Sequence, residues 1–407
     1  MTQSGYDLPL SDIRVIDFST TIAGPTATRH MSDFGAEVIK VESITHVDAA
    51  RLGGPYGKSG FSINSSGYFS KYNAGKLSLA LNMKKNGALK ILQKLVAVSD
   101  VLVEAYRPGV ISKWGITYET LKQWNPQIIM ASHSLQGQSG PRSALRGYGW
   151  LASASTGWLD ITGGKDESPV GPYSAYTDFI SWPILLSSII LALEIRNETG
   201  EGSYIDHSHL ESSAYFAAPE IVMSQQSGKP FRDGNHELYA CPNNAYRCSG
   251  DDRWCAISVD SSSAWISLCQ VLDSNHLATD TKFNSFSKRK RYETELDIAL
   301  NCLTRDRDAT ELANALVERG VAAGEVYRVE DIFSDPQLIH RSTFKRFGHS
   351  KHGDHSVLSP AIKIDKMEPG PKQAFPLLGE NTFEILVNLL GLSDKELESY
   401  RSAGVFE

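Results

Sequence analysis

Asp178 stands between an aromatic loop and a long apolar run in the segment GPYSAYTDFISWPILLSSIILALEIRNETGEG, residues 171–202. Pro183 has no backbone N–H to donate, so it suits the first turn of a helix that we expect to begin near residue 180. Asp178 would then lie at or just before the helix start. It could cap the helix, or it could be a nucleophile that the helix dipole keeps ionised and whose neighbouring N–H groups hold an oxyanion. The residue types alone favour the cap and do not decide between the two.

Other patterns that could carry chemistry are weaker. The loops GGKDESPVG and LGGPYGKSG lack both glycine patterns that cradle nucleotide phosphates. The segment HSKHGDHS places His349, His352 and His355 three residues apart, as metal ligands on a helix face would be. Its Ser, Gly and Asp residues argue against a helix, so we expect a solvated loop and no metal site. A Ser-His-Asp hydrolase would need a GxSxG elbow, which the sequence lacks.

Composition narrows the class of protein. The chain has 407 residues, of which 41% are hydrophobic and 21% charged, which is typical of a soluble globular protein of two or three domains. The formal net charge of -7 weighs against nucleic acid and against an anionic membrane surface as main partners. An anionic ligand would therefore depend on local basic groups or helix N-termini.

Cysteine usage and the N-terminus favour a cytoplasmic location. The five cysteines include no CxxC pair, so we expect reduced, buried thiols rather than a zinc site or a disulfide framework. The first residues, MTQSGYDLPLSDIRVIDFS, lack the basic start and apolar stretch of a signal peptide. The apolar segment FISWPILLSSIILALEI is short and interrupted by Ser, Trp and Pro, so we expect a buried helix rather than a membrane span.

Strand-like and helix-like segments alternate through the first third of the chain. Such alternation predicts a parallel sheet with helices on its faces and ligands at the carboxyl ends of its strands. Those ends are STTIAGP, ESITH, AYRPG and HSLQGQSGP. Turn clusters between β-rich runs after about residue 220 predict a small α+β domain. The predicted strands are 13–19, 36–42, 101–106 and 127–135, and the predicted helices are 24–35, 86–100 and 118–126.

Six segments carry a family resemblance, in order, over essentially the whole chain. They resemble the class III CoA-transferases, the family of formyl-CoA:oxalate and carnitine CoA-transferases. Several matching motifs in series are far more specific than any single one. The segments are LSDIRVIDFSTTIAGPTATRHMSDFGAEVIKVES, YNAGKLSLALNMKKNGA, VLVEAYRPGVISKWGITYETL, NPQIIMASHSLQGQSGP, LALEIRNETGEGSYIDHSHLES and FPLLGENTFEIL.

The resemblance implies a fold and an assembly. The expected fold is α/β: a large Rossmann-like domain with a parallel sheet, built from both chain ends, plus a small α+β domain. The large domain would comprise residues 1–215 and 336–407, and the small domain with its linkers 216–335. Two chains would interlock like links, as a homodimer or as a heteromer with a sister subunit.

The resemblance also implies a mechanism. In the family an aspartate just before the helix that leads to R..TG.G...D attacks an acyl-CoA thioester, and Asp178 matches it. A mixed anhydride forms, the released CoA thiolate converts it to an aspartyl-CoA thioester, and an acceptor carboxylate then takes the CoA. A carboxylate is a weak nucleophile, so positioning and desolvation must supply much of the rate. The acyl-CoA is the substrate, and neither a metal, a cysteine nor a tightly bound cofactor is expected.

CoA contacts transfer to this chain by position. Tyr106 and Arg107 match the family segment along the adenosine part. For each basic residue among these contacts the alternative is a solvated surface charge. The residues expected to bind CoA are Thr21, Ile22, Ala23, Lys76, Ala105, Tyr106, Arg107, Lys113 and Ser134.

Departures from the family pattern bear on the substrate. Ser43, Ile22 and Ala105 replace an arginine, a glutamine and an asparagine of formyl-CoA transferase, which weighs against oxalate. Tyr148 stands where the racemase branch has a histidine, so α-proton exchange lacks its base. The segments RGYGWLASASTGWLDITG and SPVGPYSAYTD look most similar to the catalytic-type subunit of benzylsuccinate CoA-transferases.

The expected acceptor is therefore a carboxylic acid with an apolar body, because Ile22 and the aromatics Tyr148, Trp150, Tyr173 and Tyr176 would favour one. The donor would be an acyl-CoA such as succinyl-CoA. Three alternatives remain: intramolecular CoA migration, racemisation, and a non-catalytic partner subunit in a heteromer, against which the retained Asp178 speaks.

Overall fold

The computed structural model describes residues 7–58, 60–227 and 232–407. The chain divides into two compact units, each described by itself below. Unit 1 comprises residues 1–161, 169–230 and 339–407, and unit 2 comprises 162–168 and 231–338. The predicted domain limits differ from these at three places: α9 (Ala218–Ser227) belongs to unit 1, the short stretch 162–168 belongs to unit 2, and the chain returns to unit 1 at residue 339 rather than 336.

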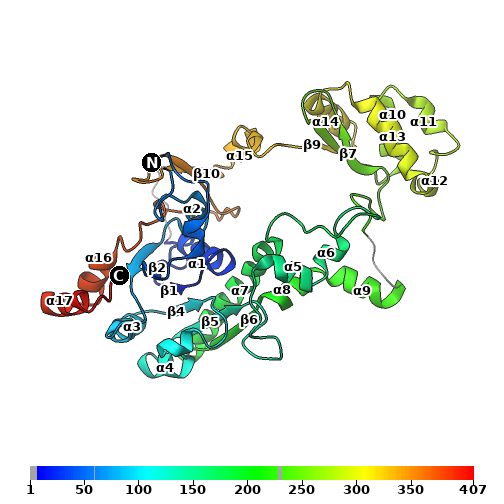
Figure 1. Ribbon diagram of the computed structural model, residues 1–407. Helices are drawn as coiled ribbons and strands as arrows, with labels where there is room; N and C mark the ends of the chain where they lie inside the picture. The colour runs from blue at the N-terminus through cyan, green and yellow to red at the C-terminus, as the bar shows by residue number, and fades with distance from the viewer. Residues whose placement is uncertain (1–6, 59, 228–231) are drawn as a thin grey trace. The chain divides into compact units, whose positions relative to one another are not determined.

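Unit 1 is built on a six-stranded sheet in the order β3-β2-β1-β4-β5-β6, with every neighbouring pair parallel (Figure 1). The order reverses between β1 and β4, where doubly wound sheets form their ligand crevice. The predicted Rossmann-like sheet is confirmed, and two short strands, β3 and β6, add to the four expected. The strands are β1 (Arg14–Phe18), β2 (Glu37–Glu42), β3 (Leu77–Ala80), β4 (Val101–Glu104), β5 (Ile129–Ser134) and β6 (Tyr204–Ser208).

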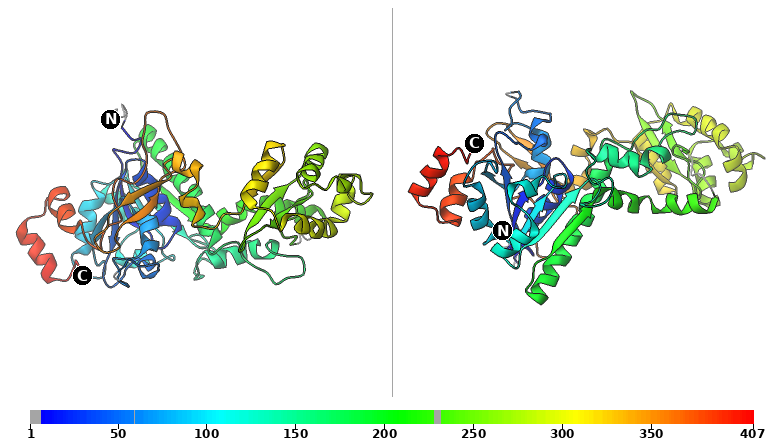
Figure 2. Two further views of the ribbon diagram at one scale, coloured as in Figure 1. Left: turned by 90° about the horizontal axis from the view of Figure 1, so that it is seen from above. Right: turned by 60° about the horizontal axis from the view of Figure 1, so that its bottom comes forward.

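Helices cover both faces of this sheet, as the nearly continuous apolar strands require. On one face α3 (Ala88–Val96), α4 (Tyr118–Trp124) and the C-terminal α17 (Asp394–Ser402) pack on residues such as Ile16 and Leu102. On the other face α1 (Ala23–Asp33) and α7 (Tyr176–Thr199) pack on their strand neighbours Val15 and Val103. The two ends of the chain thus share one core, and Figure 2 shows the red C-terminal helices beside the blue and cyan N-terminal elements.

The helix that carries Asp178 begins earlier than expected. It starts at Tyr176, so Asp178 lies in its first turn and Pro183 lies inside the helix rather than at its start. The N-cap is Ala175, which makes no side-chain capping bond. The capping hypothesis for Asp178 is therefore wrong, and the carboxylate is left for another role.

The same helix is buried on one side only. Leu185 and Ile189 have no exposed surface, whereas Leu191 and Ile195 are 61% and 47% exposed. By length and composition α7 could cross a membrane, with 33% of its apolar window buried inside the protein, but a single helix of this kind is weak evidence for a membrane span. The expected buried helix is thus half-buried, and an apolar strip remains on its outer side.

Short elements complete unit 1. Some connect the strands of the sheet, and others follow its last strand. They are η1 (Ala49–Leu52), α2 (Gly67–Asn73), η2 (Ile111–Trp114), α5 (Gly149–Ser155), α6 (Trp158–Ile161), α8 (His209–Phe216), β10 (Phe344–Phe347), β11 (His355–Leu358), α16 (Thr382–Glu384) and the π-helical turn η4 (Ile385–Leu389). Helix α15 (Pro336–His340) spans the junction between the two units.

Unit 2 is a small α+β domain, as predicted. Its three antiparallel strands follow the order β7-β8-β9 and share one apolar cluster with the helices. Four of the five cysteines are buried, Cys302 is exposed, and all five are free. The elements are β7 (Asn243–Arg247), β8 (Trp254–Ser258), α10 (Ser262–Val271), α11 (Asn275–Thr279), α12 (Phe286–Arg291), α13 (Glu293–Thr304), α14 (Ala309–Glu318), β9 (Ala322–Glu325) and η3 (Asp331–Phe333).

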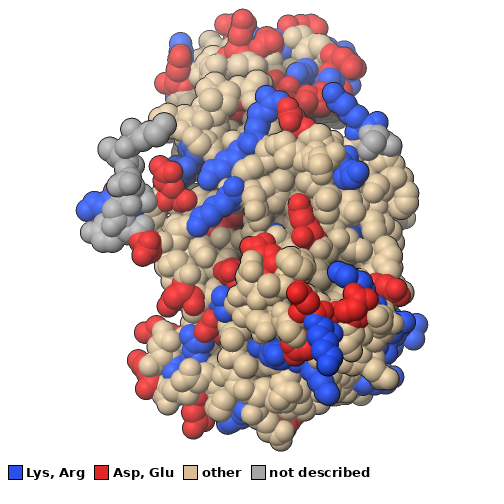
Figure 3. Space-filling model, turned by 90° about the vertical axis from the view of Figure 1, so that its left-hand side faces the viewer, with Lys and Arg blue, Asp and Glu red and all other residues tan. Residues whose placement is uncertain are grey.

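On the face drawn in Figure 3, lysine and arginine side chains lie among aspartate and glutamate side chains, separated by uncharged areas. This face offers no extended basic tract for a polyanion.

Candidate active site

Asp178 lies in a pocket of unit 1 with a volume of about 90 Å³. The pocket opens at the carboxyl ends of β1, β4 and β5, where the parallel sheet was predicted to bind its ligand. Its wall is formed by the loop after β1, the first residue after β4, the end of β5 and the entrances to α5 and α8. The lining residues are Thr20, Thr21, Ile22, Ala23, Ala105, His133, Leu135, Gly147, Tyr148, Asp178 and His209.

The carboxyl group of Asp178 is almost completely withdrawn from water. The residue is 7% exposed, and this burial raises the pKa of the carboxyl from 3.8 to about 7, against the opposing effect of a hydrogen bond from the backbone N–H of Gly149. No cation compensates it among the described residues that line the pocket. A carboxylate with a raised pKa is more basic, and hence a stronger nucleophile, than one that water or an ammonium group stabilises.

Hydrogen bonds hold the backbone of Gly149 close to the carboxyl group of Asp178. The carbonyl of Gly149 accepts hydrogen bonds from Oγ1 of Thr177 at 2.7 Å and from Oγ of Ser153 at 2.9 Å. A Cβ atom on Gly149 would meet Oδ2 of Asp178 at 2.6 Å. The first turns of α5 and α7 can therefore approach this closely only with glycine at 149.

Three histidines form a buried cluster beside the carboxylate. His133 on β5 and His207 on β6 are register partners whose Nδ1 atoms lie 2.7 Å apart. His209, the first residue of α8, stacks on His133 with ring centroids 5.4 Å apart. Nδ1 of His209 lies 3.4 Å from Oδ1 of Asp178. Burial lowers the pKa of His207 and of His209 to about 4, so both rings are neutral at pH 7.

The loop after β1 has an unusual backbone. Thr21 adopts a positive φ of 73°, which costs a threonine of the order of 1–3 kcal/mol. Its N–H donates to Oδ1 of Asp48 at 2.8 Å, and Asp48 in turn pairs with Lys40 at 2.8 Å. This buried network holds the loop, and Ile22 beside it is 2% exposed.

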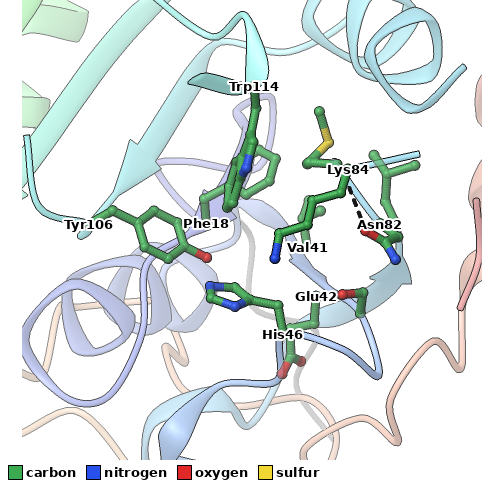
Figure 4. A pocket seen from close by; sticks show the side chains of 11 residues that line it. Phe18, Val41, Glu42, His46, Asn82, Lys84, Tyr106 and Trp114 are labelled. Atoms are coloured by element: carbon green, nitrogen blue, oxygen red, sulfur yellow. Dashed lines mark hydrogen bonds between the residues drawn. The ribbon is translucent and has the colours of Figure 1, made fainter. Parts of the chain in front are cut away.

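A second, smaller pocket of about 20 Å³ lies where β2 and β4 end. Tyr106 packs edge-on against Trp114 at 5.3 Å, and His46 lies 5.6 Å from Tyr106. Figure 4 shows these three rings and the ammonium group of Lys84 facing one space. Aromatic faces next to a cation suit a flat heteroaromatic ring that carries phosphate.

The residues predicted to bind CoA lie in several different places. Thr21, Ile22, Ala23 and Ala105 line the Asp178 pocket, whereas Tyr106 lines the second one. Arg107 and Lys113 are exposed on the segments that flank the second pocket, and Ser134 is buried at the end of β5.

Lys76 lies elsewhere. Its ammonium group has no exposed surface and contacts a carboxylate, a carbonyl, a hydroxyl and an amide oxygen, of Asp17, Pro25, Thr28 and Asn73. All its hydrogen-bonding capacity is used within the protein. The prediction that Lys76 contacts CoA thus loses its support, and we assign it a structural role.

Sequence reasoning missed several residues of these pockets. His46, Lys84 and Trp114 come from three separate segments that only the sheet brings together. His133 and His209 were also missed, because β6 ends at Ser208 and only packing brings the first residue of α8 beside Asp178. Tyr148, expected from the sequence among the aromatics that favour an apolar acceptor, lines the Asp178 pocket.

The three neighbouring histidines of the segment HSKHGDHS were expected in a solvated loop. Their rings instead pack around Phe375, with His349 stacked on it at 3.8 Å. Within residues 7–58, 60–227 and 232–407, no group of three or more His, Cys, Asp or Glu side chains has the geometry of a metal site.

Comparisons with known proteins agree with this geometry. The profile of the family described as CoA-transferase family III matches residues 10–382. Succinyl-CoA:glutarate CoA-transferase of Mus musculus is 31% identical over 402 residues, covering 98% of this chain and 90% of that protein. Succinyl-CoA–D-citramalate CoA-transferase of Chloroflexus aurantiacus is 28% identical, covering 96% of each chain.

Solved structures share the fold. A CaiB/BaiF family protein from Brucella suis has a TM-score of 0.86 and 28% identity, covering 94% of this chain and all of that one. A hypothetical protein from Mycobacterium tuberculosis, at 23% identity, has a TM-score of 0.77 over 92% of this chain and 98% of that one. This chain therefore belongs to CoA-transferase family III and is an enzyme of the CoA-transferase class.

Proposed function

We propose that this CoA-transferase carries CoA through Asp178. One carboxylate oxygen attacks the thioester carbonyl of an acyl-CoA, the C–S bond breaks, and a mixed anhydride and the CoA thiolate result. The thiolate attacks the aspartyl carbonyl of the anhydride, which releases the donor acid and leaves an aspartyl-CoA thioester. An acceptor carboxylate then attacks the aspartyl carbonyl and displaces the thiolate, which finally attacks the acceptor's carbonyl and restores Asp178. Charge and atoms balance at each step without an external proton donor.

The observation that carries this proposal is the environment of Asp178. A carboxylate with a purely structural role would cap a helix, pair with a cation or face the solvent. The carboxylate of Asp178 instead lies in a pocket, 7% exposed, with its pKa raised to about 7. Family membership supplies a reaction that uses a nucleophile of this kind. The positive φ of Thr21 places a strained loop at the same pocket, as is common where a substrate is held closely.

The second pocket is proposed to hold the adenine ring of CoA. Tyr106, Trp114 and His46 offer three ring faces, and Lys84, Arg107 and Lys113 offer positive charge for phosphates. The two pockets lie along the carboxyl edge of one sheet and share the segment Ala105–Tyr106. A ligand that reaches from one to the other would follow the loop after β4.

The donor proposed first is succinyl-CoA. Two relatives at 31% and 28% identity carry succinyl-CoA in their names, with glutarate and D-citramalate as partner acids. The acceptor proposed is a carboxylic acid with an apolar body. Among the described residues that line the Asp178 pocket none is Lys or Arg, so a second carboxylate would have no cation there, whereas Ile22 and Leu135 offer apolar contacts.

The aromatic lining is smaller than the sequence predicts. Tyr148 lines the pocket, but Tyr173 is 86% exposed and Trp150 packs over Gly171. Tyr176 packs edge-on against Trp158 at 5.1 Å. One tyrosine and aliphatic groups thus support the apolar-acceptor proposal, instead of four aromatics.

The test is the Asp178→Asn variant, which keeps the shape of the side chain and removes the nucleophile. Incubating the wild type with succinyl-CoA alone should place CoA or a succinyl group on the peptide that contains Asp178, detected by mass spectrometry. The Asn variant should form no adduct and lose at least about 1,000-fold in kcat. Full transferase activity in a folded Asn variant would rule out the mechanism.

A further inference from the structure

The buried histidines beside Asp178 have no part in the proposed reaction, yet their hydrogen bonds fix the position of every ring proton. Oγ of Ser212 has one proton and two polar neighbours, the carbonyl of Ser208 at 3.0 Å and Nε2 of His207 at 2.8 Å. We assign the proton to the carbonyl, so that Nε2–H of His207 donates to Oγ. Nδ1 of His207 is then an acceptor, and Nδ1–H of His133 donates to it at 2.7 Å. In this assignment each ring carries its proton on a nitrogen that faces an acceptor.

His209 is fixed by a different set of groups. Its Nε2 is buried without a hydrogen-bond partner among the described residues. Oδ1 of Asp178 lies 3.4 Å from its Nδ1, and the main-chain carbonyl of Thr177 interacts with the same ring. An orphaned N–H is more costly than an orphaned lone pair, so the proton belongs on Nδ1, facing both acceptors.

The ring of His209 is neutral, for identifiable reasons. It is 3% exposed and lies against the buried rings of His133 and His207, and this burial lowers the pKa of His209 to about 4. The other titratable groups near the carboxylate are Tyr68 and Tyr72 of α2, whose pKa values burial raises, and Tyr148 at the start of α5. An imidazolium would form an ion pair with Asp178, lower the pKa of its carboxyl and so weaken it as a nucleophile. A neutral imidazole can orient the carboxylate with a smaller decrease in its basicity.

We propose that His209 is a positioning residue for the nucleophile: as a neutral imidazole it donates Nδ1–H to Oδ1 of Asp178 and holds the carboxylate, ionised, in the orientation that attacks the thioester. His133, His207 and Ser212 form the buried support that keeps this ring neutral and in place. The 3.4 Å separation is longer than a normal hydrogen bond and is expected to tighten when the substrate closes the pocket. The inference rests on the proposed role of Asp178.

Variants of His209 distinguish the effect of an N–H donor at the position of Nδ1 from the effect of filling the space of the ring. His209→Leu removes the donor, so ionised Asp178 loses a partner and its acid limb should move to higher pH. His209→Asn places an amide N–H near the position of Nδ1, whereas His209→Gln places it near that of Nε2. Asn should therefore restore the wild-type profile and Gln should not. His349→Asn, on a half-buried histidine stacked on Phe375 and outside the pocket, is the matched control.

The measurement is the rate at which the aspartyl-CoA thioester forms in single turnovers with succinyl-CoA, from pH 5.5 to 9. For His209→Leu we expect the rate at pH 6 to fall about tenfold relative to the wild type and the rate at pH 9 to stay within about threefold, because a shift of one pKa unit changes the ionised fraction tenfold below the pKa. The KM for succinyl-CoA should change less than about twofold, since His209 makes no proposed contact with CoA.

Two outcomes would overturn the proposal. One is an unchanged acid limb in His209→Leu, and the other is a pH-independent loss that His209→Asn does not restore, which marks a purely structural role. If the Leu variant does not fold, the Asn and Gln variants decide, because equal profiles contradict a donor at Nδ1. The Asp178→Asn variant in the same assay distinguishes failure of the proposed function from failure of the His209 proposal. An adduct on the Asn variant refutes the proposed function itself. An inert Asn variant, together with an unshifted His209→Leu profile, refutes the role of His209 alone.

Discussion

Gly149 and Asp178 approach so closely that a single methyl group would not fit between them. A Cβ on Gly149 would lie 2.6 Å from Oδ2 and 2.7 Å from Cγ of the aspartate. The backbone N–H of Gly149 also donates a hydrogen bond to this carboxyl group. One residue thus sets both the position and part of the charge stabilisation of the proposed nucleophile.

Gly149→Ala is therefore expected to reduce kcat by about 100-fold, because a displacement of the order of 1 Å at the reacting group costs that much. Steady-state kinetics of CoA transfer from succinyl-CoA would measure it. Gly324→Ala is the matched control, since nothing lies within 4 Å of its Cβ position and its φ is not in the left-handed region. Equal activity of the two variants would show that Asp178 moves without consequence.

Asp178→Asn should stabilise the protein at alkaline pH. The folded-state pKa of about 7 exceeds the unfolded value of 3.8, so ionisation costs stability as the pH rises from 4 to 7. Between pH 5 and pH 8 this cost grows by about 2 to 3 kcal/mol for the wild type and is absent for Asn. Denaturant melts at both pH values measure the difference between the variants. A difference that does not increase with pH would contradict the buried, uncompensated carboxyl.

The two lysines proposed from the sequence to bind CoA should respond in opposite ways to substitution. Lys76→Met leaves Asp17 buried without its partner at 2.8 Å and should cost about 3 to 5 kcal/mol of folding free energy. Lys113→Met, on an exposed residue beside Trp114, should leave stability unchanged within about 0.5 kcal/mol and raise the KM for succinyl-CoA. Thermal melts and kinetics on both variants make the comparison. A stable Lys76→Met variant with only a raised KM would restore the original assignment.

Acceptor preference tests the apolar pocket. Oxalate, succinate, glutarate, phenylpropionate and benzylsuccinate should be compared as acceptors from one donor by kcat/KM. We expect the aryl acids to lead and Ile22→Gln to erode that lead, because the aliphatic side chain lines the pocket beside Asp178. Highest kcat/KM for a small dicarboxylate would show that a cation outside the described lining recognises the second carboxylate.

The protein is expected to be an obligate dimer. The apolar strip of Ile190, Leu191 and Ile195 on α7 is 40–61% exposed in the single chain and would be covered by a partner. Light scattering at micromolar concentration should give twice the mass of 44.7 kDa. An active, monodisperse species at the single-chain mass would refute the prediction, and Leu191→Glu should weaken a dimer that uses this strip.

Much of unit 1 was predictable because its information is local. The alternation in the first third of the chain gave β1, β2, β4 and β5 with α1, α3 and α4, since a parallel sheet buried on both faces needs apolar strands and amphipathic helices. The short strands β3 and β6 were missed. LSLA is only four residues long and YIDHS is largely polar, and both pair because β2 and β5 already offer free edges. The prediction that α7 begins near residue 180, which was based on Pro183, was wrong because this helix accommodates a proline in its interior.

Six motifs in series were enough to identify the family, and with it the candidate nucleophile. The surroundings of Asp178, and the residues that face a ligand, became apparent only in the folded chain. Lys76 and Lys113 are both lysines in matching motifs, yet burial makes one a structural ion-pair partner and exposure leaves the other free for phosphate. His209 and Gly149 reach Asp178 from distant segments. Proximity of this kind depends on how strands and helices pack, and the raised pKa of a carboxyl depends on that proximity and on the exclusion of water.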